Sequence, residues 1–249
     1  MPAPASPAAL QAELAAARQQ IADLAAAQEA FLRAVSHDLR APLRHVTSFG
    51  ALVRELLQEQ PPQLDEALQF LATMESSARR MGLMIDGLQA ISRAARAPLR
   101  LQAVDLRAAV QQARVALGSA ADGAQWHIDA AMPALRADPE LLAQLLQQLL
   151  ANALKFARGA APPRIAIQAQ GAAGARVHIS VQDNGVGFDA TRAQQLFGVF
   201  QRLHRESDFE GVGAGLALCQ AIAQRHGASL GATAAPGAGC SMRLDWPAA

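Results

Sequence analysis

The sequence predicts a helical hairpin that pairs into a dimeric four-helix bundle, followed by an α/β sandwich domain. Residues 10–59 contain no glycine before Gly50, and their apolar side chains recur at steps of three and four, as on one face of a helix. Beyond residue 100 the pattern changes to short apolar runs that alternate with helical stretches. Such alternation is typical of a mixed α/β domain.

Two apolar series follow one another along the first predicted helix. The first comprises Leu14, Ala17, Ile21, Leu24, Gln28 and Phe31. The second comprises Leu32, Val35, Leu39, Pro42, Val46, Phe49, Val53 and Leu56. Joining them takes a step of four residues from Gln28 to Leu32, a stutter that locally unwinds a coiled coil. We therefore expect a coiled-coil signalling helix over residues 1–30, although a slack alanine-rich helix without a fixed register explains the offset equally well.

A second helix is predicted over residues 65–92, after a break at Gln60-Pro61-Pro62-Gln63. Proline is tolerated at a helix start but not in its interior, so this segment ends the first helix. The seam of the second helix comprises Leu71, Met74, Ala78, Met81, Ile85 and Leu88. A short loop makes the pair an antiparallel hairpin over residues 31–93. Because a lone hairpin exposes much apolar surface, we expect two copies to pair as a homodimer.

Residues 94–101 are predicted to be a linker, and residues 102–249 the α/β sandwich. Strands are expected at 101–106, 125–130, 164–170, 176–182 and 240–246, and helices at 107–117, 139–157 and 216–225. Pro139 occupies a first helical turn behind Asp138, which is a good N-cap. Residues 171–174 lie between two alternating runs and predict a hairpin turn.

Composition excludes several classes of protein. The 22 basic and 21 acidic residues leave a net charge of +1, so there is no electrostatic footprint for nucleic acid. Cys219 and Cys240 lack the spacing of metal ligands. No apolar run reaches the roughly 20 residues that span a bilayer, and the first residues lack the pattern of a signal peptide. We therefore expect a cytoplasmic location and no membrane span in this chain.

His37 falls at the outward position f of the second apolar series. An ordinary solvated histidine satisfies this periodicity as well as a functional one does. Its neighbours favour chemistry, because Pro42 lies inside the helix and leaves the carbonyl of Asp38 without its N–H partner. Asp38 can orient the imidazole or take its proton. The neutral ring, dominant near pH 7, has a nitrogen that can act as a nucleophile.

Residues 36–43, SHDLRAPL, resemble the H box of sensor histidine kinases, and the wording through Val46 is most similar to phytochrome-like histidine kinases. The resemblance implies that His37 is phosphorylated from ATP and that Asp38 is its base or orienter. It also implies transfer to an aspartate of a response-regulator receiver domain. Ala41 departs from the family pattern, since members with strong phosphatase activity usually carry Thr or Asn there. We therefore expect weak phosphatase activity.

Four later segments resemble the nucleotide-binding boxes of the same family, in the family's order. They are residues 147–156 (QQLLANALKF), 183–189 (DNGVGFD), 196–204 (LFGVFQRLH) and 211–216 (GVGAGL). Each alone is also ordinary helix or turn sequence. Their order, and their extent with the H box over most of the chain, make coincidence a poor explanation.

The first of these segments places Gln148, Asn152 and Lys155 on one polar helix face. A polar stripe facing water is the plain explanation of this spacing. Against it, Lys155 is the single lysine among the 22 basic residues. An amide oxygen can serve Mg²⁺ and a lysine can neutralise phosphate. The resemblance implies Asn152 and Gln148 as metal ligands, although Gln148 replaces the usual asparagine.

The other three segments complete the predicted ATP site. By resemblance, Asp183 accepts a hydrogen bond from the adenine amino group, whereas Asp-Asn-Gly is equally ordinary turn sequence. Glycines let the backbone approach a ligand, and a glycine loop that leads into a helix makes an anion site. The residues predicted to bind the nucleotide are Asn152, Lys155, Asp183, Gly185, Gly187, Phe200, Arg202, Gly211, Gly213 and Gly215. Among them, Phe200 is expected mainly to pack, and Arg202 to contact phosphate.

Two other functions stay open. A catalytically impaired, histidine-kinase-like signalling scaffold would explain the departures at Gln148, Val212 and Ala214. A chaperone-like or mismatch-repair-like ATPase shares the nucleotide fold, but those proteins place a catalytic glutamate where Gln148 stands and have no H box. An upstream sensor domain or a separate sensor protein is expected to supply the signal. The remaining histidines are expected to be structural or surface residues: His45, His127, His178, His204 and His226.

Overall fold

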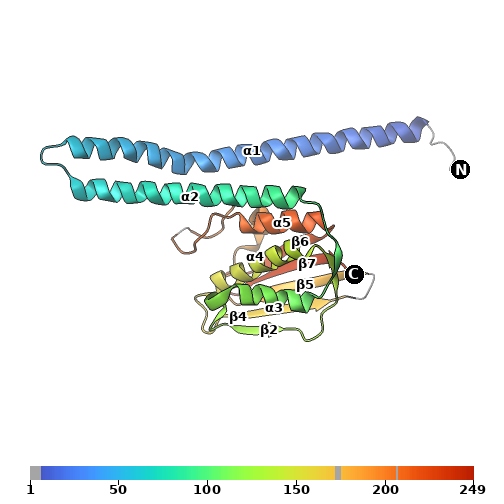
Figure 1. The fold of residues 1–249 in the computed structure, drawn as a ribbon. Helices are drawn as coiled ribbons and strands as arrows, with labels where there is room; N and C mark the ends of the chain where they lie inside the picture. Colours follow the sequence, from blue (N-terminus) through green and yellow to red (C-terminus); the bar gives the residue numbers. More distant parts are fainter. Residues whose placement is uncertain (1–6, 172–174, 206) are drawn as a thin grey trace. The chain divides into compact units, whose positions relative to one another are not determined.

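The computed structural model describes residues 7–171, 175–205 and 207–249, and Figure 1 traces its ribbon. The chain divides into two compact units, Met1–Met81 and Gly82–Ala249, which are described separately. The side chain of Leu24, in the predicted seam, and residues 172–174, in the predicted hairpin turn, lie outside the described part.

The first unit contains α1 (Pro7–Gln58) and the first half of α2 (Leu64–Arg96). The two helices pack through Val53, Leu56 and Ala67, with Phe70 and Met74 against them. The rings of Phe49 and Phe70 stack at a centroid distance of 5.1 Å. This apolar cluster closes the hairpin next to its turn. Val53, Leu56 and Met74 belong to the predicted seams, whereas Ala67 and Phe70 do not.

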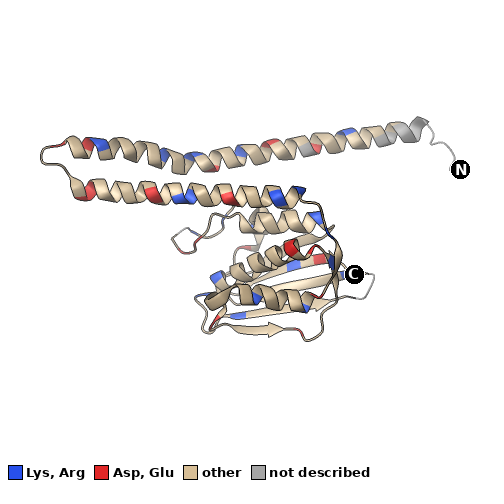
Figure 2. Cartoon of the chain, viewed as in Figure 1, with Lys and Arg blue, Asp and Glu red and all other residues tan. Residues whose placement is uncertain are grey.

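α1 remains helical through Pro42, and Figure 1 shows it bent near its middle. The bend has a local cause, because proline removes one N–H of the helix ladder and its ring crowds the preceding turn. Acidic and basic side chains are interspersed along both helices (Figure 2), as on solvated faces. In the single chain, however, Leu71 and Ile85 of the predicted seam are 40% and 47% exposed. Part of the apolar surface of α2 is therefore left uncovered.

The second unit is an α/β sandwich, which confirms the predicted fold class. After the second half of α2 its elements are β1 (Gln102–Val104), α3 (Leu106–Ala116), η1 (Gly118–Ala121), β2 (Gln125–Ile128), β3 (Leu135–Ala137), α4 (Pro139–Ala157), β4 (Arg164–Gln170), β5 (Arg176–Asp183), η2 (Ala190–Phe197), α5 (Gly215–Arg225), β6 (Ser229–Ala234) and β7 (Cys240–Pro247). A sheet of five strands has the order β2-β4-β5-β7-β6, with only β2 and β4 parallel. β1 and β3 form a separate antiparallel pair.

The core of this unit lies between the sheet and the helices that cover one of its faces (Figure 1). Each central strand buries alternate residues, such as Ile165 and Ile167 on β4 and Val177 and Ile179 on β5, as the period of two requires. α4 contributes the largest apolar stripe, from Leu141 to Ala157. Because α4 is held along its buried side, its polar face is presented at a fixed orientation.

Several elements differ from the sequence prediction, which did not include the short helical segments η1 and η2. α2 continues to Arg96 rather than ending at residue 92, so helix occupies the start of the predicted linker. β3 and β6 were not predicted, because three residues carry little period and SLGATA has only one large apolar residue, Leu230, with alanines at its other alternate positions. β6 forms because the edge of β7 offers it a full ladder from Ser229 to Ala234. Within the described residues, no helix is both long and apolar enough to cross a bilayer.

Candidate active site

His37 lies in the first unit as an exposed side chain paired with its neighbour. Its ring is 84% exposed, and its Nδ1 atom is 3.0 Å from Oδ1 of Asp38, which is only 30% exposed. An ionised carboxylate can only accept hydrogen bonds, so Nδ1 carries the proton and donates it. This tautomer leaves the lone pair on Nε2, the ring nitrogen that is not held by Asp38. The geometry therefore provides one oriented, accessible nucleophile.

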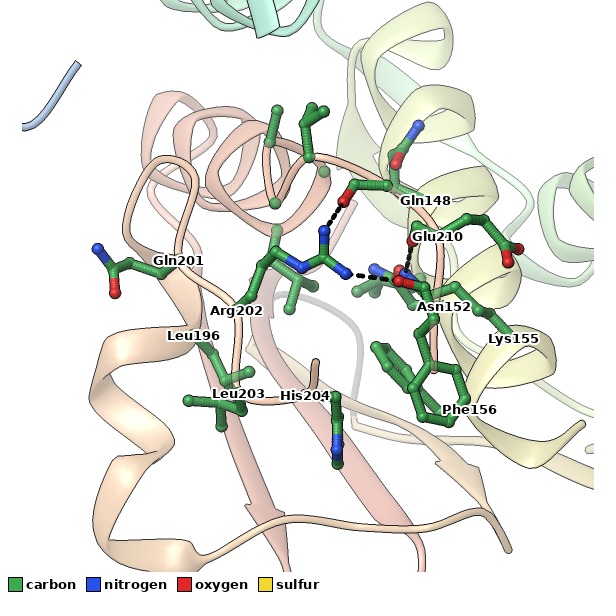
Figure 3. A pocket seen from close by; sticks show the side chains of 18 of the residues that line it. Gln148, Asn152, Lys155, Phe156, Leu196, Gln201, Arg202, Leu203, His204 and Glu210 are labelled. Carbon is green, nitrogen blue, oxygen red and sulfur yellow. Dashed lines mark hydrogen bonds between the residues drawn. The ribbon is translucent and has the colours of Figure 1, made fainter. Parts of the chain in front are cut away.

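The nucleotide-type cavity lies in the second unit and has a volume of about 480 Å³. Figure 3 shows part of its lining, with Gln148, Asn152 and Lys155 from α4 facing Arg202 and Glu210 from the loop before α5. Its other walls are formed by the end of β5 and the loop after it, by β7 and by the second half of α2: Asp183, Gly187, Phe188, Cys240, Met242, Leu83, Asp86, Gly87 and Ala90. The cavity thus collects residues from all four predicted nucleotide-binding segments.

Asp183 ends β5 and is 7% exposed. Its Oδ1 accepts hydrogen bonds from the backbone N–H of Gly185 (2.9 Å) and of Cys240 (3.2 Å). Burial raises the pKa of this carboxyl above its ordinary value, and the two N–H donors oppose that rise. Both bonds use Oδ1, which leaves Oδ2 without a hydrogen-bond partner among the described residues. A buried acceptor of this kind suits an exocyclic amino group.

The glycines after β5 allow close backbone packing. A Cβ on Gly187, whose φ is +60°, would lie 2.0 Å from the carbonyl oxygen of Ala235. A Cβ on Gly185 would lie 2.2 Å from the carbonyl oxygen of Phe156. Gly187 lines the cavity, but Gly185 does not. In this structure Gly185 therefore packs against the end of α4, and its predicted contact with the nucleotide stays a prediction.

An anion-binding arrangement forms where α4 meets α5. α5 begins at Gly215, and a Cβ there would lie 2.5 Å from Oε1 of Gln148 and 4.0 Å from Nδ2 of Asn152. The two amides therefore lie against the first turn of a helix, whose free N–H groups and dipole favour negative charge. A side chain at this position would have to displace the end of the Gln148 side chain from the cavity.

Lys155 adds a cationic side chain to the same wall. Its Nζ donates to the carbonyl oxygen of Glu210 (3.3 Å) and lies 4.4 Å from the ring centroid of Phe156. Burial lowers the pKa of Lys155, and the charge of Glu210 opposes that decrease. A partly desolvated ammonium that lines the cavity is a favourable partner for phosphate.

The loop before α5 is held by its own backbone. Phe200, at φ +63° and buried, donates its N–H to the carbonyl oxygen of Gly213 (3.0 Å). Arg202 donates to the carbonyl oxygens of Gly211 and Phe209, both at 2.5 Å (Figure 3). Arg202, Gly211 and Gly213 line the cavity, whereas Phe200 packs beneath the loop and does not. In this structure the Arg202 guanidinium, predicted to contact phosphate, binds loop carbonyls.

The predicted site residues did not include several residues of the cavity wall, among them Glu210 and His204, or Arg158, which pairs with Glu210. Arg158 binds both carboxylate oxygens of Glu210 (2.6 and 3.1 Å), and these bonds lower the pKa of Glu210 to about 2. Phe156, His204 and Phe209 form an aromatic cluster with centroid distances of 4.9–5.3 Å. His204, expected to be structural or at the surface, is thus both a packing residue and a wall of the cavity. Its position at the end of the predicted nucleotide-binding segment 196–204 was the sequence feature that could have indicated this.

The donors for a metal ion are amides rather than carboxylates. Within the described residues no group of three His, Cys, Asp or Glu side chains could hold an ion. Mg²⁺ typically takes one or two protein oxygens plus substrate phosphates and water. The amide oxygens of Gln148 and Asn152, beside the proposed phosphate position, fit such a minimal protein contribution.

Comparison with known proteins agrees with both halves of this description. Residues 27–96 match the family model described as His Kinase A (phospho-acceptor) domain, and residues 137–249 match Histidine kinase-, DNA gyrase B-, and HSP90-like ATPase. Fold and site together define a protein in which a phosphoacceptor hairpin precedes an ATPase-type domain. The chain belongs to the histidine kinases and contains the catalytic core of a sensor histidine kinase.

Curated relatives support the assignment. The chain is 32% identical to the phytochrome-like protein Cph1 of Synechocystis over 87% of its own length, and 32% identical to the sensor protein KdpD of Mycobacterium tuberculosis over 94%. It spans only 29% and 28% of the lengths of those two proteins. The resemblance therefore concerns the kinase core and not the remainder of either relative.

Solved structures show the same fold. The histidine kinase ThkA, crystallised with the response regulator TrrA, matches 93% of this chain and 65% of its own, at a TM-score of 0.64 and 17% identity. Full-length ShkA in complex with AMPPNP matches 88% of this chain and 45% of its own, at a TM-score of 0.58 and 23% identity. At these identities the likeness shows fold alone.

Proposed function

We propose that this chain transfers the γ-phosphoryl group of ATP to His37 and passes it on to an aspartate of a response-regulator receiver domain. The observation that carries the proposal is the hydrogen bond from Nδ1 of His37 to Asp38 on an 84% exposed ring. An exposed imidazole with a fixed tautomer is a nucleophile that another domain can reach.

In the proposed reaction the Nε2 lone pair of His37 forms a bond to the γ-phosphorus. The bond from that phosphorus to the β–γ bridging oxygen breaks, ADP leaves, and Asp38 takes the Nδ1 proton of the ring. Phosphoryl transfer depends mainly on positioning and on neutralising charge. Lys155 and the N-terminus of α5 would stabilise the phosphate groups, and Asp183 would bind the adenine amino group. Arg202 would join them by exchanging loop carbonyls for phosphate.

Mg²⁺ belongs to the same proposal. When bound, it would neutralise phosphate charge, and Asn152 and Gln148 would be its protein ligands. Since both ligands are neutral amides, the ion should bind with the nucleotide rather than before it. A homodimer is also proposed, because Leu71 and Ile85 are exposed in the single chain. The structure of ThkA with its regulator supports the choice of partner. We also propose a cytoplasmic location and input from an upstream sensor domain or a separate sensor protein.

The test is the incorporation of labelled phosphate from ATP in the unaltered chain, His37→Ala and His45→Ala. His45 is the matched control, because it is another exposed histidine of α1. Acid-labile phosphate should appear in the unaltered chain and in His45→Ala but not in His37→Ala, while all three bind ATP equally. Labelled His37→Ala would show that the acceptor is wrong. ATP binding without any incorporation would instead favour the impaired signalling scaffold.

A further inference from the structure

The end of α2 is capped by a side chain from a distant element of the second unit. A helix leaves its last four carbonyls without intrahelical partners. Here Arg225, at the end of α5, donates to the carbonyl oxygens of Ala94 (3.4 Å), Ala95 and Ala97 (2.6 Å). One guanidinium therefore binds three carbonyls at the exit from the helix. Its positive charge also matches the negative end of the helix dipole.

The chain that follows α2 is held by a second set of contacts. The backbone N–H of Arg100 donates to Oδ2 of Asp138 (2.9 Å), whose Oδ1 caps α4 through the N–H groups of Glu140 and Leu141. The N–H of Asp138 donates to Nε2 of the buried His226 (3.0 Å). Asp138 thus joins the linker to the start of α4, the helix that carries Gln148, Asn152 and Lys155.

His226 is fixed in turn by its surroundings. Its Nδ1 lies 2.8 Å from the carbonyl oxygen of Ile222, so Nδ1 carries the proton and Nε2 accepts from Asp138. Its ring packs on Trp246 at a centroid distance of 4.8 Å. His226, which was predicted to be structural, therefore begins a series of hydrogen bonds that runs through Asp138 to Arg100 in the linker.

The segment is packed as well as hydrogen-bonded. Ala94 is 2% exposed and belongs to the core cluster of the second unit, with Ile91 and Leu99 packed against it. The residues expected to form a linker are therefore part of the ATPase-type domain's surface layer. This arrangement ties the last turn of α2 to the core of that unit.

We propose that Arg225 is a positioning residue for the phosphoryl transfer, acting by clamping the end of α2 and the linker to the ATP-binding domain. This inference rests on the proposed kinase function. Arg225 does not line the nucleotide cavity, so the clamp acts on the geometry between domains and not on ATP itself. A reaction between groups on two domains depends steeply on how many orientations they sample, and small misplacements can cost about 100-fold in rate.

The experiment compares Arg225→Ala, Arg225→Lys and Arg107→Ala in the full chain. Arg107 is the matched control, because this arginine of α3 also donates to a backbone carbonyl of the same domain, that of Ala130 (2.9 Å), and not to the end of α2. Three quantities are measured: the dissociation constant of Mg-ATP, the first-order rate of phosphohistidine formation at saturating ATP, and the amide hydrogen exchange of residues 94–100.

For Arg225→Ala we expect an unchanged ATP dissociation constant, a rate at least about tenfold lower, and faster exchange over residues 94–100. Arg225→Lys should recover part of the rate, because an ammonium can bind one of the carbonyls. Arg107→Ala should match the unaltered chain in all three.

Two results would overturn the proposal. One is an Arg225→Ala rate equal to that of Arg107→Ala, and the other is a loss of ATP affinity in proportion to the rate. If the unaltered chain forms no phosphohistidine, the proposed kinase function fails, but the exchange measurement still decides whether Arg225 clamps the linker.

Discussion

Two carboxylates and one imidazole carry most of the proposed chemistry, and they differ in burial. The His37 ring is 84% exposed, whereas Asp183 is 7% exposed and Asp38 lies between them at 30%. The difference fits their tasks. A nucleophile must be reached by a phosphate bound to another domain, while a group that selects one base must exclude competing water.

Asp183→Asn should weaken ATP binding before it changes chemistry. The amide keeps the size of the side chain, but it replaces a charged acceptor by a neutral one that can also donate. Hydrogen bonds to a charged group contribute about 1.5–3 kcal/mol, so the dissociation constant should rise by roughly 10- to 150-fold. Titration calorimetry measures it, and Asp189→Asn is the control, because Asp189 is exposed and caps η2. Equal affinity in the two variants would contradict the assignment.

The same carboxyl predicts a pH dependence. Burial raises the pKa of Asp183, so the side chain becomes protonated at a higher pH than an ordinary aspartate. ATP affinity should therefore fall as the pH is lowered through this raised pKa. The free energy of unfolding depends on pH in the opposite direction. A carboxyl whose pKa is raised by folding stabilises the folded state at pH values below its unfolded pKa, and this contribution is lost as the pH rises through its folded pKa. Asp183→Asn should remove both dependences, as ATP titration and denaturant unfolding between pH 4 and 8 would show.

Ala41 should limit dephosphorylation of the partner regulator. Residue 41 lies one helical turn after His37 on the same face, and its methyl group cannot hold a water molecule beside an aspartyl phosphate. Losing one oriented hydrogen bond in a transition state typically costs about 10²–10³ in rate. Ala41→Asn or Ala41→Thr should therefore raise the rate at which the chain dephosphorylates the regulator. Rapid dephosphorylation by the unaltered chain, above the regulator's own decay, would refute this explanation.

At the scale of elements, the offset inside α1 is the feature with a testable consequence. α1 is one continuous helix across Gln28 and Leu32, where the two apolar series change phase. Such an offset lets the upstream coil rotate relative to the hairpin. We expect it to transmit the input signal.

Deleting residues 28–31 joins the two series into one uninterrupted seam, so kinase output should be locked high or low. Deleting residues 18–24 removes one full heptad, preserves both phases and should leave output regulated. The measurement is the autophosphorylation rate of each variant relative to the unaltered chain, with every protein fused to the same native input domain. Equal output from both deletions would mean that the offset has no signalling role.

At the scale of the whole molecule, the exposed seam predicts assembly. Leu71 is 40% exposed on α2 of the single chain, and burying one leucine contributes about 1.5–3 kcal/mol. Leu71→Glu should therefore shift the dimer towards monomer without unfolding the chain, because the residue is not part of the intrachain core. Light scattering at micromolar concentration gives the mass. The control is Thr73→Glu, another exposed position of α2, and a monomeric unaltered chain would contradict the prediction.

Elements with a strong local pattern could be predicted from sequence with little error. The predicted bounds of α4 and β4, residues 139–157 and 164–170, are those of the structure. In α4 the cap Asp138 and the following proline fix the start, and a long apolar stripe fixes the face. The same pattern made this part of the site predictable, because Gln148, Asn152 and Lys155 occupy one face of a helix whose other face is buried.

Elements stabilised by distant partners could not be predicted. β6 has only a weak alternating pattern, with Leu230 as its one large apolar residue, and it pairs with β7 over its whole length. The last turn of α2 has its carbonyls bound by Arg225. The contacts of Gly185 and Arg202 are likewise visible only in the folded chain, where one packs on Phe156 and the other donates to loop carbonyls.

The sequence alone thus determined the fold class, the outward position of His37 and the residues of the cavity that stand in recognisable segments. These features depend on periodicity and on contacts close in the chain. The tertiary structure decided the tautomer of His37, the Arg158–Glu210 pair and the clamp from Arg225 to the end of α2. The last two join residues far apart in sequence, and all three depend on side-chain geometry, which periodicity does not record.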